Sequence, residues 1–118
     1  MANVDDLVKK GFGQLGSVFT DVDGAITPPT NKVFIAITFL ADTTLDASGG
    51  LVADTNYGSA EFVGTEAAAH DASTATITSG TGGDQIDASN TFPKGCTIFG
   101  RWTEIDLDAG MIIAYIGE

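Results

Sequence analysis

Two pairs of aspartates, each pair separated by one residue, are the clearest candidates for metal chemistry in this sequence. They are Asp21 and Asp23, followed by Gly24, and Asp106 and Asp108. Calcium loops place carboxylate oxygens at alternate positions in this way. A complete calcium loop also needs further oxygen ligands and a closing Glu at a fixed position, and neither segment supplies them. We therefore expect these aspartates to shape loops and turns, with no metal ion and no other cofactor.

Nucleophilic catalysis has little support in the sequence. His70 is the only histidine and precedes Asp71, but no Gly-x-Ser-x-Gly motif accompanies the pair. Cys96, the only cysteine, begins an apolar segment, where a free Cys usually behaves as a small buried hydrophobe. The Gly-rich residues 80–83 lack the Lys-Ser/Thr that follows in a phosphate-binding loop. The sequence predicts a protein that is not an enzyme.

Composition narrows the range of partners. With 5 basic and 16 acidic residues among 118, the net charge is −11. Such a charge repels nucleic-acid phosphates and anionic membrane surfaces, so we expect neither as a partner. Apolar residues 33–40 are too few for a membrane span, and the N-terminal residues lack the pattern of a secretory signal. We expect one domain, made in the cytoplasm.

The apolar segments predict β-strands. Residues 33–40 and 111–116 are apolar at nearly every position, as in strands covered on both faces, and residues 96–105 read as a further long strand. Residues 106–110 are predicted to form a turn. Strands separated by turns at this spacing predict an all-β domain over residues 32–118, an antiparallel β-sandwich or small barrel. The doubly covered strands also predict a homotrimer, in which neighbouring subunits would cover one face.

Residues 1–31 differ from the rest of the chain. A short helix is possible at residues 3–10, and the apolar residues that follow show no sustained period of 2 or 3.6. We interpret residues 1–31 as an extended arm that is either draped on its own domain or docked on a neighbour, and a first strand with loops is the alternative. The expected interface residues of this arm are Phe12, Val18, Phe19 and Ile26.

Arg101 and Trp102 are the only Arg and the only Trp, and they are adjacent on the long predicted strand. Their side chains should therefore point to opposite faces of the sheet. We expect Trp102 in the core or in a seam between subunits, and Arg101 paired with a carboxylate. Because both residue types are common in binding hot spots, we include both as candidate interface residues.

Residues 92–116 include Phe92-Pro-Lys-Gly, Gly-Arg-Trp-Thr-Glu-Ile105 and Ile-Ile-Ala-Tyr-Ile116. In these segments, and in its general sequence character over residues 28–118, the chain resembles small virion structural proteins of tailed phages, especially those of cyanobacterial and marine phages. Its size, acidity and Gly/Thr/Ala-rich composition are most similar to capsid decoration (cement) proteins. The resemblance implies a homotrimer on the capsid surface of the virion, made in the host cytoplasm, that stabilises the head by bridging subunits of the major capsid protein.

A second function class has the same composition. A phage fibre or spike domain that binds host surface carbohydrate is also β-rich and lacks catalytic residues. Sugar sites favour exposed aromatic side chains, and this chain has one Trp and two Tyr, Tyr57 and Tyr115. The small number of Trp and Tyr residues favours the structural role over the carbohydrate-recognition module.

Overall fold

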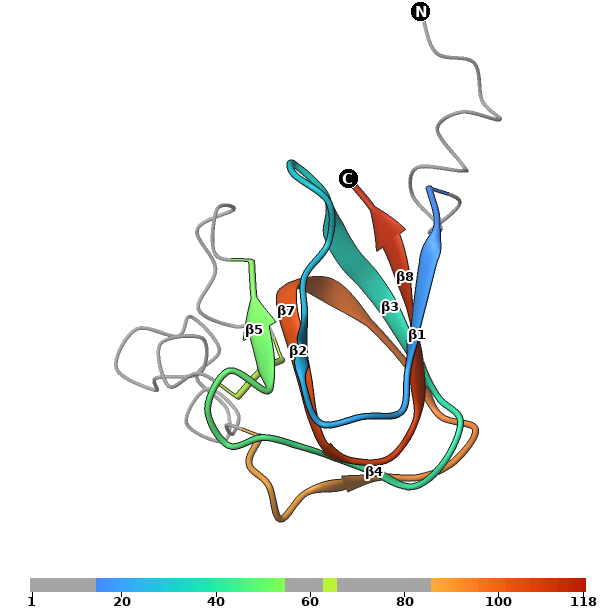
Figure 1. Ribbon diagram of the computed structural model, residues 1–118, viewed down its shortest axis with the longest axis vertical. Coiled ribbons are helices and arrows are strands. Elements are labelled where there is room, and N and C mark those ends of the chain that lie inside the picture. Colours follow the sequence, from blue (N-terminus) through green and yellow to red (C-terminus); the bar gives the residue numbers. More distant parts are fainter. Residues whose placement is uncertain (1–14, 55–62, 66–85) are drawn as a thin grey trace, which may run out of the picture.

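The computed structural model describes residues 15–54, 63–65 and 86–118 (Figure 1). These residues form eight strands of one antiparallel sheet and contain no helix. The predicted all-β, antiparallel, single-domain fold is confirmed. Within the same residues, no helix is long and apolar enough to cross a membrane.

The long strand β7 (Thr97–Ala109) organises the sheet. Its first half pairs with β3 (Val33–Phe39) and its second half with β2 (Ala25–Ile26). It also pairs with β5 (Leu51–Ala53) and β4 (Thr43–Leu45). One strand from the C-terminal part of the chain therefore holds together four strands from residues 25–53.

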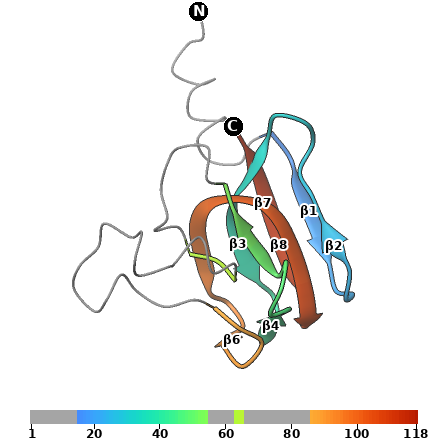
Figure 2. The ribbon, with the colours of Figure 1, turned by 90° about the vertical axis from the view of Figure 1, so that its left-hand side faces the viewer.

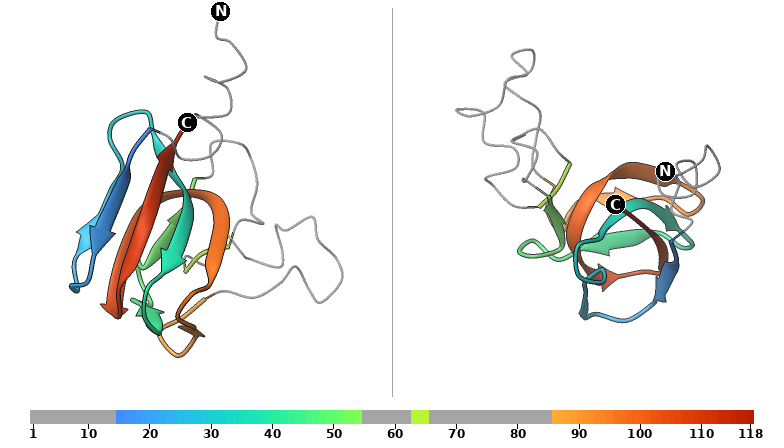
Figure 3. Two further views of the ribbon diagram at one scale, coloured as in Figure 1. Left: turned by 90° about the vertical axis from the view of Figure 1, so that its right-hand side faces the viewer. Right: turned by 90° about the horizontal axis from the view of Figure 1, so that it is seen from above.

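The remaining strands extend the sheet on both sides. β8 (Ile112–Gly117) lies between β3 and β1 (Ser17–Thr20), and β6 (Thr91–Phe92) pairs with β4. The register of β3 shifts between Phe34 and Ala36 against both of its neighbours. Such a bulge increases local bend and twist. The sheet accordingly curls around one interior into a barrel-like form, which is clearest in the side view and the view from above (Figures 2 and 3).

Residues 17–26 are part of the sheet rather than an extended arm. β1 pairs with β8 over four residues, and β2 pairs with β7. The alternative interpretation, a first strand with loops, describes this segment. The hydrophobic pattern of the sequence does not reveal these strands, because β1 has four residues and β2 has two, which is too few to establish a period of 2. The possible helix at residues 3–10 lies outside the described residues.

The predicted turn at residues 106–110 is also wrong. β7 continues through Asp106 and Asp108 to Ala109, and the chain turns at Gly110 instead. Alternating Asp and apolar residues fit a strand that buries Leu107, with Asp106 half-buried and Asp108 exposed on either side of it. The two aspartates therefore project from a sheet rather than from a loop.

The interior of the curled sheet is filled by buried apolar side chains from five strands, β3, β4, β5, β7 and β8. Trp102 is its largest member and is fully buried, and its indole Nε1 donates a 2.7 Å hydrogen bond to the carbonyl oxygen of Val63. The rings of Phe39 and Phe92 stack with centroids 4.7 Å apart. The other core residues are Phe34, Ile37, Leu45, Leu51, Ala53, Ile105, Leu107, Ile112, Ala114 and Ile116.

Two glycines with positive φ provide a matched test of how tightly the β7–β8 turn is packed. Gly110 (φ 125°) has Thr43 so close that an added Cβ would lie 2.7 Å from the Thr43 Cα, whereas Gly95 (φ 89°) has open space at that position. Gly95→Ala should therefore cost only backbone strain, about 1–2 kcal/mol. We expect Gly110→Ala to cost about 1–3 kcal/mol more, because it adds a clash to the strain.

The two free energies of unfolding can be compared by urea denaturation of the two variants and the wild type. Equal losses for Gly110→Ala and Gly95→Ala would show that the packing of Gly110 against Thr43 is unimportant.

Candidate functional site

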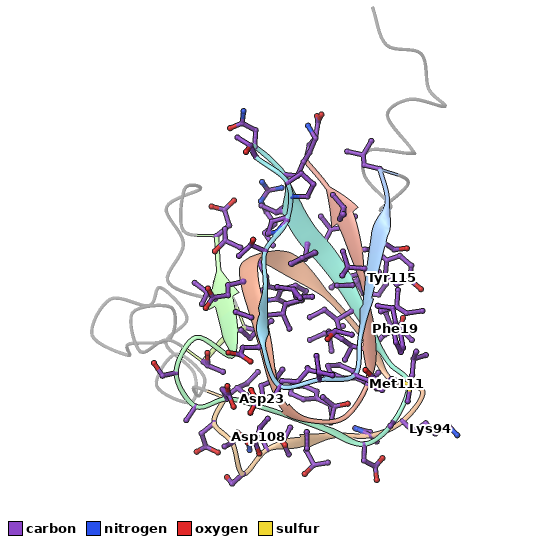
Figure 4. The ribbon with its side chains drawn as sticks, viewed as in Figure 1. Phe19, Asp23, Lys94, Asp108, Met111 and Tyr115 are labelled. Carbon is purple, nitrogen blue, oxygen red and sulfur yellow. The ribbon has the colours of Figure 1, made fainter. Side chains whose placement is uncertain are left out.

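Four aspartates converge at one end of the curled sheet, and we call them the acidic cluster: Asp23, Asp46, Asp106 and Asp108. Carboxylate oxygens of Asp23, Asp46 and Asp108 all lie within 4.8 Å of one another. Asp106, two residues before Asp108 on β7, interacts electrostatically with Asp23 and Asp46. Figure 4 shows Asp23 and Asp108 close to each other, where the β1–β2 loop approaches β7.

Backbone pairing holds the acidic cluster in place. The N–H of Asp46 donates to the carbonyl oxygen of Asp106 (3.0 Å), and the N–H of Asp106 donates to the carbonyl oxygen of Gly50 (2.9 Å). The hydroxyl of Thr44 donates to Oδ2 of Asp108 (3.2 Å). The carboxylates are therefore brought together by strand pairing, although their mutual repulsion opposes it.

The crowding changes the acidity of two members. Partial burial raises the pKa of Asp46, and the charges of Asp106 and Asp23 raise it further. Partial burial and the charge of Asp23 likewise raise the pKa of Asp106. Both shifts mean that the folded protein holds these carboxylates in a less favourable environment than the unfolded chain does.

The acidic cluster offers hard oxygen ligands, the kind that Ca²⁺ takes in proteins. Asp23 and Asp108 come from the two separate pairs noted in the sequence, and Asp46 joins them from the residue after β4. No local sequence pattern indicates that these three residues meet, because they are far apart in the chain. The expectation that folding requires no metal stays a prediction: a chelator should leave the melting temperature unchanged.

Replacing one crowded carboxylate by its neutral isostere tests the repulsion. Because the folded pKa of Asp46 lies above its ordinary value of 3.8, its contribution to stability is greatest at low pH and is lost as pH rises through the folded pKa. We expect Asp46→Asn to raise the melting temperature at pH 7 in chelator-containing buffer. The difference from wild type should shrink as pH falls below the ordinary Asp range.

Asp87 is the matched control for this prediction. Hydrogen bonds from the hydroxyl and the backbone N–H of Ser89 lower the pKa of Asp87. Asp87→Asn should therefore leave the melting temperature at pH 7 unchanged or lower it. If Asp46→Asn changed the melting temperature at pH 7 by the same amount as Asp87→Asn, or lowered it, the result would contradict repulsion within the acidic cluster.

A second surface feature lies on the outside of β1, β8, β3 and β7. The strand register aligns Phe19, Ile113, Thr38 and Thr97 in one cross-strand row. It aligns Ser17, Tyr115, Ala36 and Phe99 in the next row. Directly paired residues point to the same side of a sheet, so these eight side chains share one face. We call it the outer face.

The outer face exposes large apolar side chains. Phe99 is 73% exposed and Phe19 is 56% exposed, while Ile113 and Tyr115 are half-buried. Phe19 and Tyr115 are seen on the outer side of β1 and β8 in Figure 4. The hydroxyls of Thr38 and Thr97 hydrogen-bond to each other at 2.9 Å. The two exposed phenylalanines on one face make the outer face a candidate contact surface.

The candidate interface residues fall into different environments. Val18 and Ile26 are half-buried and pack against the protein's own core, whereas Phe19 is on the outer face. Phe12 lies outside the described residues, as do His70, Asp71 and residues 80–83. Half-buried Cys96 packs against the core, in agreement with a structural role.

Arg101 and Trp102 point to opposite sides of β7, as the sequence predicted. Trp102 is fully buried within the chain's own core, so it is not available to an interface. Of the two places expected for this residue, the structure has the core and not a seam between subunits. Arg101 pairs with the buried carboxylate of Asp54 (3.3 Å) and donates to the carbonyl oxygen of Glu118 (2.7 Å). The guanidinium of Arg101 is therefore paired within the chain, and these two interactions link β7 to the ends of β5 and β8.

Comparisons with protein-family models, with curated proteins and with solved structures find no match.

Proposed function

We propose that this chain is a non-enzymatic structural protein of a tailed-phage virion, a capsid decoration protein that stabilises the head by bridging major capsid subunits. The observation that carries the proposal is the outer face, where Phe19 and Phe99 are exposed on an otherwise strongly acidic molecule. A protein that acts by contact needs such a surface, and burial of each Phe ring stabilises a contact by roughly 1.5–3 kcal/mol.

The resemblance to phage structural proteins concerns the part of the chain that builds this surface. Residues 92–116 run from the turn after β6 through β7 and most of β8. They supply Thr97 and Phe99 from β7 and Ile113 and Tyr115 from β8, half of the outer face. The segment that resembles virion structural proteins therefore presents half of the outer face, including Phe99, while Phe19 is supplied by β1.

The shape of the molecule also suits this role. A small curled sheet held by strand pairing along β7 can be attached to a surface without a large conformational change. Its acidity disfavours binding to packaged nucleic acid, so the exterior of the capsid is the proposed location. The proposed partners are the major capsid protein and further copies of this chain in a homotrimer.

The direct test is binding to phage heads assembled without this protein. Wild-type protein should co-sediment with such heads, and imaging at subnanometre resolution should place its density on the outside of the shell between major capsid subunits. Heads that already carry the protein are the control and should bind no more of it.

Failure to bind undecorated heads would overturn the proposal. Density found on a fibre or tail instead would favour the alternative function, a module that recognises host surface carbohydrate.

A further inference from the structure

We propose that the outer face is the surface on which a second copy of this chain docks. The inference deepens the proposed function, because it names the partner of this face. The eight side chains involved are Ser17, Phe19, Ala36, Thr38, Thr97, Phe99, Ile113 and Tyr115.

The first argument is charge. None of the eight side chains is charged, although the chain carries 16 acidic residues and a net charge of −11. Arg101, two residues after Phe99 on the same side of β7, has its guanidinium paired with Asp54. Two copies repel each other wherever their carboxylates meet, and the repulsion is worst at the acidic cluster. A basic partner would gain most from the acidic surface, whereas an identical acidic chain is best accommodated by a face without carboxylates.

The second argument is the arrangement of large and small side chains. Phe19 and Phe99 are on β1 and β7, which have two strands between them and so are about 14 Å apart, and the two residues lie in neighbouring rows of the outer face. Between them β3 contributes only Ala36 and Thr38. A ring from a second copy can therefore pack over the small β3 side chains, between the aromatic residues on both sides.

The third argument concerns the polar groups that such a contact would cover. Thr38 and Thr97 hydrogen-bond to each other across β3 and β7. Part of their hydrogen-bonding capacity is thus met within the chain, which lowers the cost of removing them from water. The half-buried Ile113 and Tyr115 of β8 would also lose their remaining contact with water, which explains why the sequence of this strand is apolar on both faces.

The experiment is sedimentation equilibrium on the isolated wild-type protein and on two variants, Phe99→Asp and Phe19→Asp, over a concentration range from low to high micromolar. We expect wild type to self-associate. Each variant should weaken association at least about tenfold, because it removes a buried ring and places a carboxylate in the contact.

Val22→Asp is the matched control. Val22 is 63% exposed, as much as the two phenylalanines, but it lies in the β1–β2 loop and not on the outer face. The same charge change there should leave self-association within about twofold of wild type, because the Val22 side chain is not one of the eight that the proposed contact buries. Circular dichroism and the melting temperature verify that all three variants fold, which exposed positions should permit.

Ionic strength distinguishes a second copy from a basic partner. Salt screens the repulsion between two chains of like charge, so self-association should strengthen as salt is raised. Contact driven by attraction of opposite charges would weaken instead.

Three results would overturn the inference. They are a wild-type protein that stays monomeric at every concentration and salt level, outer-face variants that associate as tightly as wild type, and a Val22→Asp variant that is as impaired as they are. Head binding separates this inference from the proposed function. A protein that is monomeric in isolation and still decorates heads would refute the self-docking face alone, whereas one that self-associates through the outer face and ignores heads would refute the decoration role alone.

Discussion

The structure depends on hydrogen-bonded pairing along β7. This strand pairs with β3, β2, β5 and β4, all of which come from residues 25–53 in the first half of the chain. Each of these partners other than β3 has only two or three residues, too short to be stable without a longer template. The contacts of β7 are made between residues distant in sequence, so the loop-closure cost is large and is met by the buried side chains on its inner face. The core and both surface features follow from this one strand.

Much of the fold was predictable because the long strands carry their own signal. Residues 33–40 and 111–116 are apolar and β-branched, and the structure has β3 and β8 there. The four-residue strand β1 and the two-residue strand β2 were not predictable, since they form only by pairing with β8 and β7. The two aspartates beside Leu107 in the second half of β7 predict a turn, because Asp is common in turns and uncommon in strands.

The two surface features were predictable to different degrees. Exposure of Phe19 and Phe99 on one face requires the strand order β1-β8-β3-β7, which no local pattern contains. The meeting of Asp23, Asp46 and Asp108 likewise requires the β2–β7 and β4–β7 pairs. Within the part of the chain that the structure describes, they give an uneven charge distribution, with carboxylates crowded in the acidic cluster and eight uncharged side chains on the outer face. Such an asymmetry orients a protein as it approaches a charged surface.

The position of Trp102 makes the protein its own optical probe. It is the only tryptophan in the chain, so all indole emission comes from one site, and that site is the fully buried residue where β7 meets both β3 and β5. Its Nε1 hydrogen bond to the carbonyl oxygen of Val63 links the same ring to a segment outside the sheet. The wavelength of its fluorescence therefore registers water entry at the junction of three strands, while a contact made on the outer face leaves the ring in its dry environment. Unfolding and assembly of this protein can thus be followed separately, unfolding by the wavelength of Trp102 fluorescence and assembly by sedimentation.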